Sequence, residues 1–95
     1  MKNSIIVEKS ETGDELYFRI NLGKVSNTVE ITDSMYVDMD SKGNLLGVEW
    51  INIKGCTKNL TGASKDYSNV PEIKALKERF PETAQRITGL IQGIM

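Results

Sequence analysis

Histidine is absent from this chain of 95 residues, and cysteine occurs once, as Cys56. Without histidine the chain has no common general base, and neither a Ser-His nor a Cys-His nucleophile pair can form. One cysteine supplies no disulfide within the chain and no structural zinc site. Catalysis by Cys56 would need a cationic neighbour that stabilises the thiolate, and only Lys54 and Lys58 are near it in sequence. We therefore expect no catalytic residue and no cofactor.

Long hydrophobic runs are also missing. The apolar residues 5–7 are too few for a signal peptide, and no segment approaches the length of a membrane-spanning helix. The net charge of −1 is unevenly spread, with five basic and nine acidic residues in 1–53, and seven basic and four acidic residues in 54–95. This positive excess is small for a protein that must neutralise phosphates. We expect a cytoplasmic protein that binds neither membranes nor nucleic acid.

The first half of the chain alternates apolar and polar residues, which is the pattern of half-buried strands. The expected strands lie near residues 5–7 and over 16–22, 28–32, 35–40 and 45–53. The polar links between them are short, which favours antiparallel neighbours and predicts a meander of about five strands. The last of these strands is apolar on both faces, as is typical of a central or covered strand.

The second half begins with an aperiodic segment, 54–69, which is rich in Gly, Ser, Thr, Asn and Lys and is predicted to be a loop. Apolar residues then recur at helical spacing. Pro71 suits a first helical position, and Pro81 interrupts the pattern. We expect two short helices or one helix kinked at Pro81. The prediction is one α+β domain over 1–95, with a β-meander, a loop and a helical segment from residue 70.

The predicted helices share an apolar stripe. It consists of Ile73, Leu76, Phe80, Ile87, Leu90, Ile91 and Ile94. This stripe would either cover the sheet or form the seam of a dimer. A chain of this size has little stability in reserve, so self-association is expected. The interface of the homodimer would be the stripe or the last strand, 45–53.

One acidic pattern resembles a metal site. Four residues match positions of a calcium-binding loop, namely Asp38, Asp40, Gly43 and Glu49. Lys42 stands where a further oxygen ligand is required, and strand patterns replace the flanking helices, so a β-hairpin turn at Gly43 is favoured. Alternatively, the three carboxylates would hold magnesium or manganese in a metal-dependent enzyme, although no base or nucleophile accompanies them.

A second group of polar residues lies on the strands. Tyr17, Arg19 and Tyr36 alternate with the apolar residues, so they fall on the opposite face of the predicted sheet. Tyrosine and arginine are frequent in protein recognition surfaces. These side chains would form such a surface, or their rings would simply cover the outside of a thin sheet.

Three segments carry a resemblance to a known family. They are DELYFRI at 14–20, VEITDSMYVDMD at 29–40 and GNLLGVE at 43–49. Together they resemble the bacterial and phage family known as domain of unknown function 2283, over residues 14–53. The sequence departs from the family pattern at Asp33-Ser34, where the family has Asp-Gly.

The resemblance implies a compact β-rich fold and brings no activity, cofactor or catalytic residue. Because catalytic residues are missing, the core is small and residues 70–95 have a surplus of apolar side chains, we expect a small non-catalytic binding or interaction module. The alternative that the resemblance implies is a phage or mobile-element accessory protein. Such a protein would inhibit a host defence protein or sequester a nucleotide signal, using the loop at 54–69.

Overall fold

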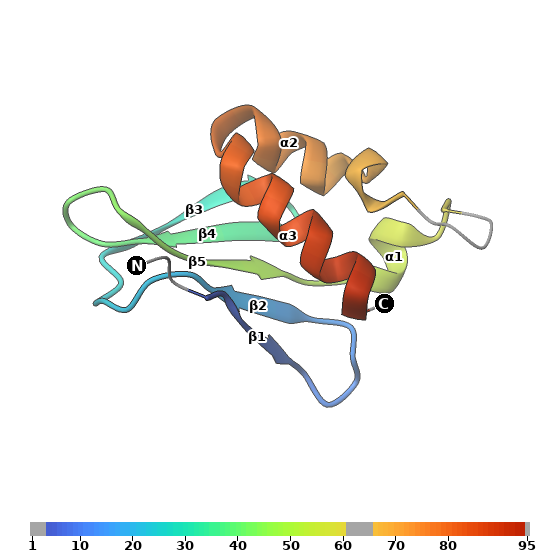
Figure 1. Cartoon of the computed structure of the whole chain (residues 1–95), viewed down its shortest axis with the longest axis horizontal. Coiled ribbons are helices and arrows are strands. Elements are labelled where there is room, and N and C mark those ends of the chain that lie inside the picture. The colour runs from blue at the N-terminus through green and yellow to red at the C-terminus, as the bar shows by residue number, and fades with distance from the viewer. Residues whose placement is uncertain (1–3, 61–65, 95) are drawn as a thin grey trace. The chain divides into compact units, whose positions relative to one another are not determined.

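The computed structural model describes residues 4–60 and 66–94 (Figure 1). Its elements are β1 (Ile6–Lys9), β2 (Leu16–Arg19), β3 (Asn27–Thr32), β4 (Met35–Met39), β5 (Leu45–Trp50), α1 (Ile53–Thr57), the 3₁₀ turn η1 (Tyr67–Asn69), α2 (Pro71–Arg79) and α3 (Pro81–Ile94). An antiparallel five-stranded sheet followed by helices confirms the predicted α+β class. The chain divides into two compact units, Met1–Ile53 and Lys54–Met95. One domain over 1–95 stays a prediction.

The strand order of the sheet is β1-β2-β5-β4-β3 (Figure 1). The consecutive hairpin partners of a meander are present for β1 with β2 and for β3, β4 and β5. The predicted pairing of β2 with β3 is wrong, because β2 pairs with β5 instead. After β2 ends, the chain continues next to β5. There the N–H groups of Ile20 and Asn21 donate to the carbonyl oxygen of Leu46 at 2.8 and 3.2 Å. β5 is therefore central, as its pattern predicted.

One face of the sheet is apolar. Two rows cross it in register, Leu16, Trp50 and Met35 in the first and Phe18, Val48 and Val37 in the second. None of these six side chains is more than 2% exposed. The strand predicted over 16–22 is too long, because β2 ends at Arg19 and Leu22, at the predicted end, is 87% exposed.

The link between β4 and β5 is the predicted hairpin turn. The Asp40 carboxylate accepts hydrogen bonds from the backbone N–H groups of Lys42 and Asn44 at 2.9 and 2.8 Å. The hydrogen bonds from the backbone and side chain of Asn44 hold the pKa of Asp40 below its ordinary value. Gly43 has φ +85°, a conformation that glycine adopts without strain. The turn thus explains both Asp40 and Gly43 without a metal.

The unit Lys54–Met95 contains the two predicted helices, which lie side by side (Figure 1). α2 begins at Pro71 and ends where Phe80 leaves the helical region with φ −136° and ψ 67°. A residue before proline is disfavoured in that region, so α3 starts anew at Pro81. Two separate helices are confirmed. Within the described residues, no helix is long and apolar enough to cross a membrane.

The predicted loop at 54–69 is only partly correct. Its start belongs to α1, and its end forms η1, while residues 61–65 lie outside the described part of the chain. η1 is capped by Asp66, whose carboxylate accepts the backbone N–H of Ser68 at 3.1 Å and the side-chain amide of Asn69 at 3.0 Å. These short local hydrogen bonds produce no apolar period, which is why the pattern missed the turn.

Candidate recognition face of the sheet

The face of the sheet opposite the apolar rows is polar, and we call it the polar face. Its first row in register contains Glu8, Tyr17, Glu49, Tyr36 and Glu30. Its second row contains Ile6, Arg19, Gly47, Asp38 and Thr28. The predicted recognition residues Tyr17, Arg19 and Tyr36 therefore share one face. The structure brings them together with Asp38 and Glu49.

Asp38 is the centre of a hydrogen-bonded group. Tyr17 Oη donates to Asp38 Oδ2 at 2.9 Å, and Thr28 Oγ1 donates to Asp38 Oδ1 at 2.6 Å. These three side chains come from β2, β4 and β3, so the group spans most of the sheet's width. Both oxygens of one carboxylate are used, which fixes the position of the Tyr17 hydroxyl.

Gly47 makes this group possible. β5 lies between β2 and β4, so the ring of Tyr17 must pass over β5 to reach Asp38. It does so at Gly47, where an added Cβ would overlap Tyr17 Oη and Cζ. Glycine weakens a strand interior and often marks a close approach of another group. The residue pattern of the chain indicates no role for Gly47 or Thr28, because their roles depend on the strand order.

Arg19 and Tyr36 make contacts that are weaker than those of Tyr17 with Asp38. The Arg19 guanidinium lies 5.4 Å from the centre of the Tyr17 ring and pairs with Glu8 at 3.3 Å. The Arg19 and Glu8 side chains are 41% and 53% exposed, so their ion pair contributes little to stability. Tyr36 Oη donates to the carbonyl oxygen of Asp33 at 3.0 Å. The Arg19 side chain therefore remains adjustable for a partner.

The surroundings of Tyr17 keep its hydroxyl protonated. Burial, the hydrogen bond to Asp38 and the charge of Asp38 raise the pKa of Tyr17 to about 12, against a smaller lowering by Arg19. At neutral pH this phenol is a fixed hydrogen-bond donor and not a base.

This raised pKa predicts a loss of stability in alkali. A tyrosine of the unfolded chain ionises near its ordinary pKa of 10.0, whereas folded Tyr17 holds its proton to about 12. The folded state therefore binds more protons over this range, so the free energy of unfolding falls as the pH rises from about 10 to about 12. Urea unfolding measured across this range, with Tyr17→Phe as the control, tests the prediction. A variant with the same pH dependence as the original protein would contradict it.

The three candidate metal ligands do not form one site. Asp38 is bonded to Tyr17 and Thr28, Asp40 is used within its turn, and Glu49 lies in the other row of the polar face. β4 ends at Met39, so Asp40 belongs to the turn and not to the strand that carries Asp38. Across residues 4–60 and 66–94, no three His, Cys, Asp or Glu side chains are grouped to hold a metal ion.

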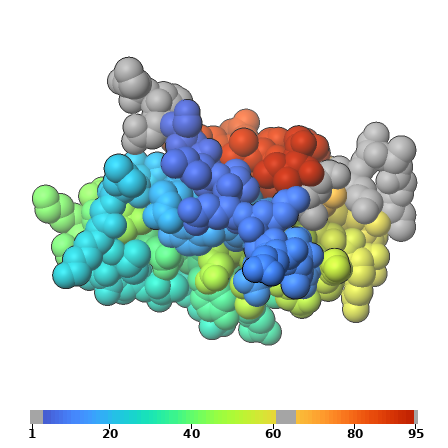
Figure 2. Space-filling model, turned by 90° about the horizontal axis from the view of Figure 1, so that it is seen from below, coloured from blue at the N-terminus to red at the C-terminus, as the bar shows by residue number. Residues whose placement is uncertain are grey.

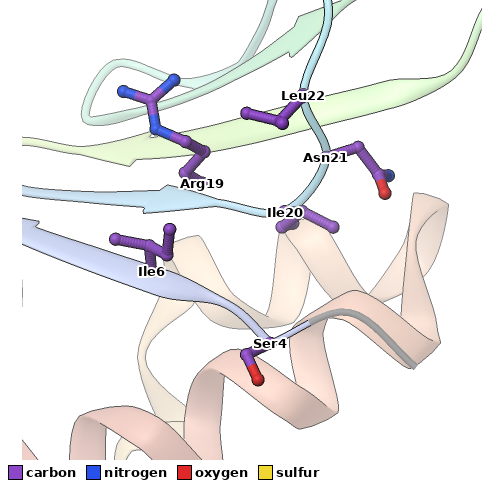
Figure 3. A pocket seen from close by; sticks show the side chains of 6 residues that line it. All are labelled: Ser4, Ile6, Arg19, Ile20, Asn21 and Leu22. Atoms are coloured by element: carbon purple, nitrogen blue, oxygen red, sulfur yellow. The ribbon is translucent and has the colours of Figure 1, made fainter. Parts of the chain in front are cut away.

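Two hollows border Tyr17 and Arg19. The first, of about 240 Å³, lies beside Tyr17 and is lined by Glu8, Glu15 and Glu49 together with Lys9. It extends the acidic character of the polar face. The second, of about 370 Å³, is lined by Ser4, Ile6, Arg19, Ile20, Asn21 and Leu22 (Figure 3).

The second hollow is more apolar at its rim. Ile6 is 54% exposed, and Leu22 is more exposed still. Figure 2 shows this part of the surface, with β1 in blue and the chain after β2 in cyan. In Figure 3, Arg19 and Ile20 leave opposite sides of the chain, so only Arg19 belongs to the polar face.

The predicted interface residues of the helical stripe are mostly covered within one copy. Ile73, Leu76, Ile87 and Ile91 are at most 2% exposed. Phe80 and Leu90 are partly exposed, and Ile94 is 37% exposed. The last strand, β5, has hydrogen-bonded neighbours on both edges, so it offers no free edge for pairing with another copy. Pairing along an edge of β5 is therefore blocked, and self-association itself stays a prediction.

Comparison of this chain with protein-family models, with curated proteins and with solved structures found no match. The resemblance of residues 14–53 to domain of unknown function 2283 therefore stays a prediction.

Proposed function

We propose that this chain is a small non-catalytic binding module whose recognition surface is the polar face of the sheet. The observation that carries the proposal is the Tyr17–Asp38 hydrogen bond across Gly47. A glycine in a central strand is unfavourable for the sheet. Here it allows one aromatic ring to be held in a defined place on an exposed surface, and such preorganisation lowers the cost of binding.

The chemistry of this face favours binding over reaction. Tyr17 keeps its proton at neutral pH, and the chain contains no histidine to activate a nucleophile. The lone thiol, that of Cys56, belongs to α1 and not to the sheet. What the face offers is aromatic surface, hydrogen-bonding groups and charge, which are the means of recognition.

The charge of the face favours a cationic partner. It carries Glu8, Glu30, Asp38 and Glu49, against Arg19 as its single cation. Carboxylates beside tyrosine rings attract lysine and arginine side chains through charge and through cation–π contacts. We therefore propose a basic segment of a protein as the ligand class.

The test is a titration of this protein with a labelled unstructured peptide rich in lysine and arginine. We expect saturable binding that weakens as salt is added, because exposed charges are screened. An acidic peptide of equal length should not bind. Absence of saturable binding to the basic peptide at low salt would overturn the proposed function.

A pair of matched variants localises the site. Glu49→Gln removes a carboxylate from the polar face, and Glu11→Gln removes one from the exposed turn after β1. Both change the net charge equally. Loss of one exposed charge pair should raise the Kd about threefold for Glu49→Gln only. Equal effects of the two substitutions would show general charge attraction and contradict a site on this face.

A further inference from the structure

The two edges of the sheet differ in how they are protected. β1 is four residues long and carries Glu8 and Lys9, and short charged strands discourage pairing with other chains. β3, the other edge (Figure 1), is six residues long, has four β-branched side chains and only one charge, Glu30. None of its residues is buried. β3 is therefore the edge that is open to another strand.

The sequence around β3 is complementary to itself. Residues 24–30 read Lys-Val-Ser-Asn-Thr-Val-Glu, with matching residues at equal distances on either side of Asn27. When two copies run antiparallel with Asn27 opposite Asn27, each residue meets its counterpart. Ser26 then faces Thr28, Val25 faces Val29, and Lys24 faces Glu30, twice each. These are hydroxyl, apolar and opposite-charge pairs, all of which stabilise neighbouring strands.

Residues 27–30 of this segment belong to β3, and residues 24–26 precede the strand. The N–H of Ser26 donates to the carbonyl oxygen of Met39 at 2.8 Å, so the chain already follows β4 before β3 begins. Val25 is 47% exposed. Lys24 and Glu30 are both exposed, and neither makes an ion pair with another described residue. The groups that a second copy would meet are therefore accessible.

The pairing also keeps the two faces continuous. Opposite residues of antiparallel strands point to the same side. Val29 lies opposite Val37 of the apolar face, and Glu30 lies opposite Tyr36 of the polar face. Valine pairs would therefore extend the apolar rows, and Lys–Glu pairs would lie on the polar side.

Charge disfavours one alternative register with the same facing, which is shifted three residues along the strand. Pairing centred on Glu30 would place two carboxylates directly opposite each other, which is destabilising. Centring on Asn27 instead gives each Glu30 a lysine partner from the other copy.

We propose that two copies of this chain associate through β3, in an antiparallel register centred on Asn27, so that their sheets become continuous. This inference assigns the surface for the self-association that the size of the chain predicts. Glu30 belongs to both this interface and the polar face, but Glu8, Asp38 and Glu49 stay on the polar face of a monomer and of a dimer. A basic peptide could therefore bind either form.

The experiment measures the monomer–dimer equilibrium by sedimentation velocity. The original protein should be a dimer, and Glu30→Lys should raise the dissociation constant at least about tenfold, because two attractive charge pairs become repulsive. Lys24→Glu should do the same. Both positions are exposed, so the variants should keep the circular dichroism spectrum of the original protein.

Mixing the two single variants gives the decisive result. In a mixed dimer, Lys24 of one copy faces Glu30 of the other, and the introduced Lys and Glu face each other as well. The mixture should therefore form dimers as tightly as the original protein, and so should Lys24→Glu/Glu30→Lys. Glu11→Lys, an equal change of charge in the exposed turn after β1, should leave the dimer intact.

Three outcomes would overturn the inference. They are a monomeric original protein at millimolar concentration, a dimer that Glu30→Lys leaves unchanged, and a mixture of the single variants that stays monomeric. None of them alters the peptide titration of the Glu49→Gln variant. The dimer and the proposed function can therefore fail separately.

Discussion

Replacement of Trp50 by alanine is expected to lower the free energy of unfolding by about 3–5 kcal/mol. Trp50 is 0% exposed and lies on the central strand, in register between Leu16 and Met35. Its removal leaves a cavity in the middle of the apolar row. The free energy of unfolding of a small domain is only about 5–15 kcal/mol in total, so this loss is a large fraction of it and part of the variant should be unfolded. Trp50 is the only tryptophan, so its replacement removes the tryptophan fluorescence signal. Urea unfolding followed by circular dichroism measures the loss of stability instead.

Trp50→Phe is the matched control. Among the described residues, the buried Nε1 of Trp50 has no hydrogen-bond partner. Phenylalanine keeps part of the ring and removes this unsatisfied N–H, so we expect a loss below about 2 kcal/mol. If Trp50→Phe cost as much as Trp50→Ala, ring volume would not explain the role of this residue.

Replacement of Gly47 by alanine should disturb both the sheet and the recognition face. The new Cβ would overlap the Tyr17 ring, which must then move off β5 and lose its hydrogen bond to Asp38. Overpacking of this kind costs about 1–3 kcal/mol. The same change should weaken binding of the basic peptide, because Tyr17 is no longer held in place. Urea unfolding and the peptide titration measure the two effects.

Two controls separate this effect from a general cost of losing glycine. Gly89→Ala in α3 adds a Cβ with no neighbouring atom of the described residues within 4 Å, so it should raise helix stability by about 1 kcal/mol. In a Tyr17→Ala background, Gly47→Ala should cost much less than in the original protein. An unchanged cost in that background would show that the Tyr17 ring is not what requires Gly47.

The local patterns of the chain were sufficient to place most elements. Alternating residues located all five strands, and Pro71 and Pro81 set the starts of both long helices. These signals depend on side-chain spacing and on the fixed φ of proline, which act within a few residues. The capped turn η1 gave no apolar period and was missed.

Only part of the candidate site could be predicted from these local patterns. Tyr17, Arg19 and Tyr36 could be assigned to one face because alternation decides which side of a strand a residue occupies. The partner of Tyr17 could not, because Asp38 is two strands away in space and the strand between them comes later in the chain. The role of Gly47 follows only from this strand order, which places β5 between β2 and β4.

By itself, the sequence determined the periods, the breaks between elements and the residues of each face, since these follow from local backbone geometry. Only the tertiary structure decided the strand order, the register at Asp38 and the identity of the open edge. Those features depend on hydrogen bonds between segments far apart in the chain, which no local pattern contains. Segment 24–30 is an example of each kind of feature. Its self-complementary residues can be identified from the sequence, whereas its exposure at the edge strand β3 is known only from the strand order.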